Sequence, residues 1–159
     1  MAWPDSVERV AAFLRAAGAE ARIEEFATGT ATAADAARAV GCTSAEIVKS
    51  LVCVCDGRAV VALVPGDRRG DTAKIARAAG ATAARVARPD EVRELTGFDP
   101  GAVAPFPLSR VDRALIERTL LARTDLWIGA GSPRHMAVLP TAELVRLAKA
   151  APADLIAAD

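Results

Sequence analysis

Apolar positions at the start of the chain recur with the period of a helix. Four of them fall on one helical face, and they are Val7, Val10, Phe13 and Leu14. We therefore predict a helix through residue 17, with Asp5 or Ser6 as its amino-terminal cap and Gly18 as its end. Further along, the pattern changes to continuous apolar runs of strand length, so the chain combines both kinds of element.

Asp56 and Gly57 separate two apolar runs, residues 47–55 and 58–64. An Asp-Gly pair between apolar runs is a strong signal for a β-hairpin, because both residues tolerate the positive φ angles of a two-residue turn. We therefore predict an antiparallel strand pair. Cys53 lies two positions before another cysteine in the first run, so both thiols should point to the same face of the sheet.

Capping residues delimit the remaining elements. Thr30 or Thr32 can cap a second helix that Gly41 ends. Asp71 can cap a third helix and Thr141 a closing one. The predicted helices cover residues 5–17, 33–40, 72–79, 89–95 and 142–150, and the predicted strands cover residues 21–26, 47–55, 58–64, 83–87, 125–130 and 136–139. The segment 96–107 is rich in Gly and Pro and should form an ordered loop, whereas 112–121 fits either a short helix or a strand.

The order of these elements predicts the fold class. Strands and helices alternate, and the hairpin introduces an antiparallel pair, so we expect an α/β fold with a mixed, curved β-sheet flanked by helices. No linker, repeat or low-complexity segment divides the 159 residues, and this length suits one domain. We therefore interpret residues 1–159 as a single domain.

Charge and cysteine content limit the partners of the chain. The 20 Lys and Arg residues balance 20 Asp and Glu residues, which excludes the strongly basic coat of many nucleic-acid-binding proteins but not a local basic patch.

No run of about 18 uncharged apolar residues predicts a membrane span, and the first 13 residues do not resemble a signal or transit peptide. An odd number of cysteines, three, favours reduced thiols. We expect a cytoplasmic protein that binds neither membrane nor DNA.

Lysine and histidine are rare in this chain. Three of the 20 basic residues are lysines, and His135 is the one histidine. The lysines are Lys49, Lys74 and Lys149. Because most basic positions in this chain are arginine, a lysine or a histidine indicates a position where arginine was not accepted. Lys49 interrupts an apolar strand, and burying an ammonium without a partner is costly. It should therefore reach a cleft, a carboxylate or a ligand, or else extend to water.

Two loops could contribute to a functional site. Gly101 and Pro105 lie in the segment 97–106, where free backbone N–H groups could bind an oxyanion or a phosphate. A structural crossover would have the same composition. The second loop, residues 129–135, ends at His135, which is either an acid, base or hydrogen-bond donor or a structural histidine.

The sequence offers little for a metal or a cofactor. One histidine and three dispersed cysteines make a poor ligand set for a metal ion. Gly129 and Gly131 lack the third glycine and the following helix of a dinucleotide site, and no phosphate-binding P-loop is present. We therefore expect neither a metal nor a cofactor.

These segments occur in the order and spacing of the YbaK/EbsC family, which is related to the editing domain of bacterial prolyl-tRNA synthetase. The resemblance covers a core of about residues 19–147 and implies a sheet that is partly barrel-like. It lies mainly in the motifs Thr32-Ala33-Ala34, Ile47-Val48-Lys49-Ser50-Leu51, Gly101-Ala102-Val103-Ala104-Pro105-Phe106 and Gly129-Ala130-Gly131-Ser132-Pro133.

The resemblance implies a role for each matching residue. Lys49 would be the hallmark lysine of the family, contacting the terminal adenosine of a tRNA and its phosphate. The backbone of the loop from Gly101 to Pro105 would hold the aminoacyl carbonyl, and Gly131, Ser132 and His135 would line the pocket opposite. The catalytic set is then Lys49, Gly101, Ala102 and His135, and the substrate-binding set is Thr32, Ser50, Val103, Pro105, Gly129, Gly131 and Ser132.

Members of this family are mostly trans-acting aminoacyl-tRNA deacylases. The resemblance implies hydrolysis of the ester of a mischarged tRNA, carrying Cys, Ala, Ser or Thr on tRNA-Pro or a related tRNA. The partners would be the 3′ end of the tRNA and an aminoacyl-tRNA synthetase. An aminoacyl ester is already activated, so water, the ribose 2′-OH or the substrate side chain could attack it once positioned.

Two alternatives to a deacylase stay open from the residues. One is a non-catalytic module that binds tRNA ends or another nucleotide in the same cleft. The other is a metal-dependent hydrolase, which the poor ligand set disfavours.

Overall fold

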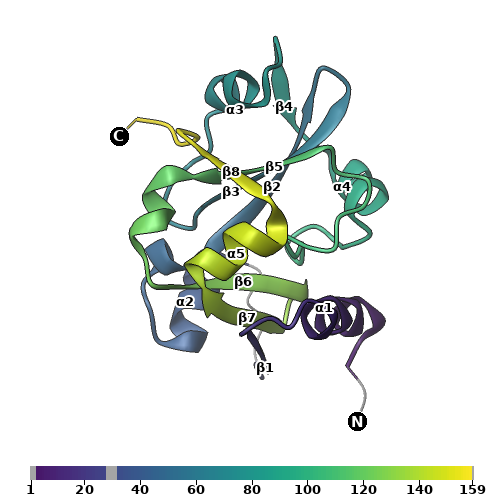
Figure 1. Ribbon diagram of the computed structural model, residues 1–159, viewed down its shortest axis with the longest axis vertical. Helices are drawn as coiled ribbons and strands as arrows, with labels where there is room; N and C mark the ends of the chain where they lie inside the picture. The colour runs from purple at the N-terminus through teal and green to yellow at the C-terminus, as the bar shows by residue number, and fades with distance from the viewer. Residues whose placement is uncertain (1–2, 28–31, 159) are drawn as a thin grey trace.

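Two β-sheets, one above the other in the view of Figure 1, form the frame of the molecule. The computed structural model describes residues 3–27 and 32–158. The larger sheet has the strand order β4-β2-β3-β5-β8, and the smaller has the order β1-β7-β6. The strands are β1 (Arg22–Glu25), β2 (Val48–Cys55), β3 (Arg58–Pro65), β4 (Ala84–Val86), β5 (Arg113–Glu117), β6 (Asp125–Ser132), β7 (His135–Pro140) and β8 (Ala150–Ala153).

Five α-helices and two short 3₁₀ helices of the described residues surround these sheets (Figure 1). They are α1 (Asp5–Ala16), α2 (Ala33–Val40), α3 (Thr72–Ala79), α4 (Pro89–Thr96), α5 (Thr141–Ala148), η1 (Ser44–Glu46) and η2 (Arg118–Ala122). None of the described helices is long and apolar enough to cross a membrane. The predicted α/β fold is confirmed.

The larger sheet is mixed, as predicted. β2 and β3 form the expected antiparallel hairpin, and β3 pairs in parallel with β5, which pairs in parallel with β8. Cys53 and Cys55 lie on one face of β2, both buried, and burial raises the pKa of Cys53 to about 12. Neither sheet formed by the described residues closes on itself, so the partly barrel-like expectation is not confirmed.

Most predicted elements form within a few residues of their predicted ends. Thr32 caps α2, since its hydroxyl accepts a hydrogen bond from the Asp35 amide at 3.0 Å, and the alternative cap, Thr30, lies outside the described residues. Asp71 caps α3 through the amides of Ala73 and Lys74. The ambiguous segment 112–121 contains β5 followed by η2.

Two predictions near the carboxyl end were wrong. Thr141 does not cap α5: it is the first helical residue, and its hydroxyl donates instead to the Arg123 carbonyl at 2.6 Å. The helix also ends at Ala148, after which Lys149 adopts a left-handed φ of 52° and the chain enters β8. This strand was not predicted, because Ala and Pro carry little intrinsic preference for strands.

The two sheets meet at the start of β2. A parallel backbone bridge joins Ile47, just before β2, to Trp127 of β6. α2 covers the smaller sheet beside this junction, where Ala36, Ala37 and Met136 pack together. α1 packs against β6 with Val10 and other apolar residues. Residues that are distant in the sequence therefore converge where the sheets meet.

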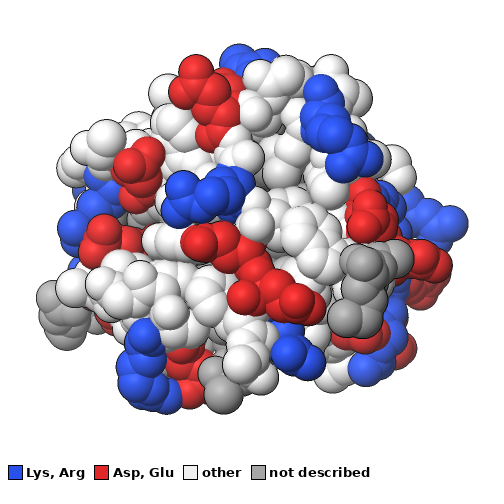
Figure 2. All heavy atoms as spheres, turned by 90° about the horizontal axis from the view of Figure 1, so that it is seen from below, with Lys and Arg blue, Asp and Glu red and all other residues white. Residues whose placement is uncertain are grey.

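Charges of both signs are interspersed on the surface. Figure 2 shows the molecule from below the view of Figure 1, and blue and red side chains alternate on this face with white surface between them. The described residues form no continuous basic surface on this face. This mixture of acidic and basic side chains agrees with the formal net charge of the sequence, which is zero.

Candidate functional site

A cavity of about 240 Å³ lies where the two sheets meet. Its walls come from the start of α2, the start of β2, the loop between α4 and β5, and strands β6 and β7. Six of the predicted site residues line it together, and they are Thr32, Lys49, Ser50, Gly101, Val103 and Gly129. The fold therefore brings residues from four separate sequence motifs into one cavity.

Lys49 lies near the start of β2 and is half-buried. Its ammonium donates a hydrogen bond to the carbonyl oxygen of Arg68 at 2.7 Å. Burial lowers the pKa of Lys49, and the nearby charge of Asp67 opposes this shift. An ammonium has three donors, and the described residues accept from one of them. The other two are available to an anionic group in the cavity.

A tight turn shapes the loop that forms the facing wall. The Ala102 amide donates to the Asp99 carbonyl at 3.0 Å, and Gly101 has a φ of 81°. Proline followed by a positive-φ glycine is typical of a type II turn. The amides of Gly101 and Val103, which both line the cavity, have no acceptor in the described part of the chain. This wall therefore offers backbone donors rather than charged side chains.

Ala102 differs from its two neighbours. It is buried, does not line the cavity, and uses its amide inside the turn. Its backbone N–H is therefore not available to hold an aminoacyl carbonyl as the family resemblance implied.

Gly129 lets this loop lie against β6. A Cβ atom at this position would be 2.9 Å from the carbonyl oxygen of Val103. Real Cβ atoms do not approach backbone oxygens so closely, so a side chain here would displace the loop. The width of the cavity thus depends on the absence of a side chain at Gly129.

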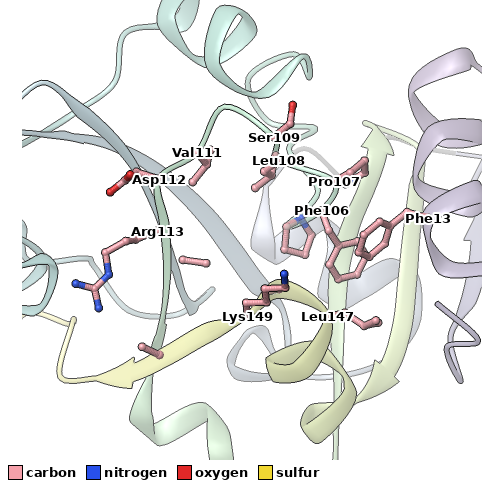
Figure 3. A pocket seen from close by; sticks show the side chains of 14 residues that line it. Phe13, Phe106, Pro107, Leu108, Ser109, Val111, Asp112, Arg113, Leu147 and Lys149 are labelled. Atoms are coloured by element: carbon pink, nitrogen blue, oxygen red, sulfur yellow. The ribbon is translucent and has the colours of Figure 1, made fainter. Parts of the chain in front are cut away.

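Pro105 lies in the same loop but lines a different cavity. This second cavity has a volume of about 480 Å³. Figure 3 shows Phe13 and Phe106 side by side at its edge, with ring centroids 4.8 Å apart, and Lys149 pointing into it. Pro105 is therefore separate from the Lys49 cavity.

The structure does not bring Gly131, Ser132 and His135 into the Lys49 cavity. Met136 lines that cavity, and successive side chains of a strand point to opposite faces, so His135 is directed to the other face of β7. A Cβ at Gly131 would lie 2.7 Å from the backbone oxygen of Ser6 in α1. The expectation that these three residues line the opposite wall is therefore corrected.

His135 forms a buried polar group of its own. Its Nδ1 lies 2.5 Å from the Ser132 hydroxyl, and its ring packs edge-on against Trp3. Its Nε2 has no hydrogen-bond partner among the described residues, although a carboxylate oxygen of Glu25 lies 3.3 Å away, outside hydrogen-bond geometry. Burial lowers the pKa of His135, while Glu25 opposes the shift. This arrangement favours a neutral histidine with a structural role.

The predicted set omitted several lining residues. Met136 and the small side chains of Ala33 and Ala36 give the cavity its apolar interior. Strand alternation puts Met136 and His135 on opposite faces of β7, so the prediction that His135 lies in the site excluded Met136. No local signal indicates that Arg68 supplies the carbonyl beside Lys49, because this contact joins the start of one strand to a loop beyond the next.

Among the described residues that line the cavity, Lys49 carries the only ionisable side chain. None of its described lining residues is Asp, Glu, His or Cys. The described residues also contain no group of three or more such side chains arranged to hold a metal ion. Chemistry at this site would therefore depend on the ammonium, the backbone donors and the bound substrate itself.

A family model described as the aminoacyl-tRNA editing domain matches residues 27–147. The chain belongs to the aminoacyl-tRNA editing domain family. This confirms the resemblance to the YbaK/EbsC family, and every described residue that lines the Lys49 cavity falls within the matched range.

The relatives of this editing domain include proline–tRNA ligases. The chain is 33% identical over 117 residues to the ligase of Xanthomonas oryzae pv. oryzae (strain MAFF 311018), a match that covers 73% of this chain and 21% of that protein. It is 34% identical over 109 residues to the ligase of Maridesulfovibrio salexigens, covering 68% and 19%. The chain thus spans about a fifth of the length of these relatives.

A solved structure matches the editing domain over nearly its whole length. The crystal structure of a candidate trans-editing enzyme for prolyl-tRNA synthetase superimposes with a TM-score of 0.91 at 37% identity. The match covers 99% of this chain and 100% of that chain. The fold described above is therefore that of a YbaK-like editing domain.

Proposed function

We propose that this editing domain acts in trans, in the cytoplasm, to hydrolyse the ester of a mischarged aminoacyl-tRNA. The observation that supports this most is the meeting of Lys49 and the Gly101–Val103 backbone in one cavity inside the matched family range. The whole chain would serve as one editing domain that receives the 3′ end of the tRNA, with an aminoacyl-tRNA synthetase as a further partner.

The ammonium of Lys49 would bind the phosphate next to the terminal adenosine, with the two donors that the described residues leave available. The amides of Gly101 and Val103 would stabilise the negative charge that develops on the ester carbonyl oxygen. A water molecule would attack the carbonyl carbon, its proton would pass to the departing ribose oxygen, and the tRNA would leave as the alcohol. Attack by the ribose 2′-OH or by the substrate side chain would first give a transferred or a cyclic ester, which water would then hydrolyse. No side chain of the described cavity is required as a base.

The size and lining of the cavity favour a small amino acid. Its volume of about 240 Å³ would have to hold the amino acid together with part of the terminal adenosine, and its lining includes the apolar side chains Ala33, Ala36 and Met136. Small side chains differ by only about 1–3 kcal/mol in binding energy, which is why a separate editing step is useful. Cys, Ala, Ser and Thr, on tRNA-Pro or a related tRNA, are the substrates we propose.

One observation favours a second function. The described cavity residues include no carboxylate, histidine or thiol that could act as a general base. A module that binds tRNA ends or another nucleotide without hydrolysing an ester would need no such group. This is the alternative that an experiment has to separate from the deacylase.

The experiment is a deacylation assay of the purified protein on tRNA-Pro charged in turn with Cys, Ala, Ser, Thr and Pro. We expect hydrolysis of at least one non-cognate ester and a loss of about 10- to 100-fold in Lys49→Ala, the range for a charged hydrogen bond. Lys149→Ala is the matched control, because Lys149 is an exposed lysine outside the Lys49 cavity. Binding of the tRNA 3′ end without hydrolysis of any ester would support the binding module instead.

A further inference from the structure

The hydrogen-bond partner of Lys49 lies in a loop rather than in the sheet. Arg68, whose carbonyl oxygen accepts from the ammonium at 2.7 Å, belongs to the connection between β3 and α3. A carbonyl fixes the direction of an ammonium only if its own backbone is fixed. The position of Lys49 therefore depends on what holds residues 67–70.

A segment from the end of the chain holds this loop. Residues 154–157, here called the tail, run beside residues 67–70 and form an antiparallel bridge between Gly70 and Ile156. The Ala157 amide donates to the Arg69 carbonyl at 2.8 Å, and Nη2 of Arg68 donates to the Ala157 carbonyl at 2.8 Å. Beyond Gly70 the Asp71 amide donates to the Leu155 carbonyl at 2.8 Å, so the loop is paired with the tail on both sides of Gly70.

The tail is anchored in turn to the larger sheet. Leu155 is fully buried, and its amide donates to the carboxylate of Glu117 at 2.9 Å. Glu117, at the end of β5, is fully buried and also accepts from the Thr119 amide at 2.8 Å. Nζ of Lys74 donates to the Ile156 carbonyl at 2.7 Å. The tail is therefore a fixed part of the fold, not a loose end.

We propose that the tail is a positioning element for Lys49: by pairing with residues 67–70, it fixes the Arg68 carbonyl and through it the ammonium in the cavity. The tail follows the range that the family model matches, which ends at residue 147. The proposal rests on the proposed function for its effect on catalysis, but the contact itself does not depend on that function. Residues 154–157 act on the substrate only through Lys49.

Two neighbouring arginines allow a matched test. Arg68→Ala removes the guanidinium that donates to Ala157 and leaves the Arg68 carbonyl in place. Arg69→Ala removes the same charge one residue away, from an exposed side chain, and keeps the Arg69 carbonyl that pairs with the tail. Arg68→Lys restores a cation at the first position. Ile156→Ala loosens the packing of the tail without touching Arg68, and thermal unfolding shows which variants are folded.

The decisive readout is the side-chain NMR signal and pKa of Lys49, which are easily assigned in a chain with three lysines. In Arg68→Ala and Ile156→Ala we expect the Lys49 signal to move and its pKa to change, because the ammonium loses a fixed hydrogen-bond acceptor. The deacylation kcat/KM should fall about 10-fold, the effect of losing one hydrogen bond of about 1.4 kcal/mol. Arg68→Lys should recover most of this loss, and the Lys49 signal in Arg69→Ala should match the unmodified protein.

A Lys49 signal that stays unchanged in both Arg68→Ala and Ile156→Ala would overturn the proposal. A Lys49 signal that moves equally in Arg69→Ala would also overturn the proposal, because the change would then come from the loss of one positive charge and not from the pairing with the tail. If the protein deacylates none of the esters, the proposed function fails, while the NMR signal of Lys49 still decides whether the tail positions it.

Discussion

A lysine that is half-buried holds its proton less firmly than one in water. Burial lowers the pKa of Lys49, with the charge of Asp67 acting against it. A group whose pKa falls on folding costs stability while it is charged, and this cost fades as the pH rises between the folded and unfolded values. The same shift determines the pH range in which Lys49 can attract a phosphate.

As the pH rises, binding of a phosphate in the cavity should weaken at a lower pH than it would if the phosphate were bound by an exposed lysine. The protonated ammonium attracts the phosphate, and a lowered pKa removes the proton earlier as the pH rises. The dissociation constant of a non-hydrolysable 3′-aminoacyl analogue of adenosine 5′-monophosphate, measured from neutral to alkaline pH, checks this. In Lys49→Arg the guanidinium stays charged, so the affinity for the analogue should no longer fall at alkaline pH. Identical pH profiles for the two proteins would contradict the role of Lys49.

Gly129→Ala should impair the site more than the fold. The new Cβ would meet the Val103 carbonyl oxygen at 2.9 Å, so the loop that carries Gly101 has to move. A displacement of about 1 Å can cost about 100-fold in rate, whereas overpacking costs about 1–3 kcal/mol of stability. Deacylation kinetics and urea unfolding measure the two effects. Full activity in Gly129→Ala would show that the loop absorbs the extra carbon without consequence.

Single residues also show where prediction from sequence stopped. Residue type and motif predict Lys49, Gly101 and Gly129 as site residues, and the fold brings all three to one cavity. The same reasoning predicts His135, yet strand alternation directs its side chain away from the cavity. Residue type indicates what chemistry a side chain can perform, whereas the face it occupies depends on pairing with distant strands.

At the scale of elements, the sequence predicts helix ends and turns correctly where a single residue or a short pair determines the local structure. The caps Thr32 and Asp71 and the Asp56-Gly57 turn act within a few residues, and the structure confirms them. β8 failed because its strand conformation comes from pairing with β5, more than 30 positions away, and not from its own alanines. The tail is likewise held by residues distant in the sequence, because its partners lie in the loop between β3 and α3.

Thr32 connects a helix cap to the cavity wall, because α2 carries Ala33 and Ala36. Thr32→Ala should remove the hydrogen bond to the Asp35 amide and destabilise α2 by about 1 kcal/mol. Hydrogen exchange of the α2 amides should then accelerate about 5-fold, since local opening governs exchange. Thr32→Ser keeps the hydroxyl and serves as the control. Equal exchange in Thr32→Ala and the unmodified protein would mean that the cap contributes nothing to α2.

At the scale of the whole molecule, the balance of charge limits how RNA can be bound. The formal net charge is zero, and charges of both signs alternate on the face shown in Figure 2. Recognition should therefore be confined to the end of the tRNA, inserted into the cavity, and involve few phosphates. The described residues on that face form no long basic track that could follow the tRNA body.

Affinity for a single-stranded 3′-end oligonucleotide should consequently depend only weakly on salt. Contact with about three phosphates gives a slope of about −2 for the logarithm of the association constant against the logarithm of salt concentration. Fluorescence anisotropy across a series of KCl concentrations measures this slope. A slope steeper than about −5 would indicate an extended electrostatic interface and would refute recognition limited to the end.

The bridge between Ile47 and Trp127 places the cavity across the boundary of two sheets. A molecule that touches Lys49 on one side and Gly129 on the other would fasten the two halves of the fold to each other. Any such ligand raises the melting temperature, and a concentration of about 100 times its dissociation constant adds about 2.7 kcal/mol to the free energy of unfolding. Thermal shift can therefore rank aminoacyl-adenosine analogues by affinity, without charged tRNA and without turnover.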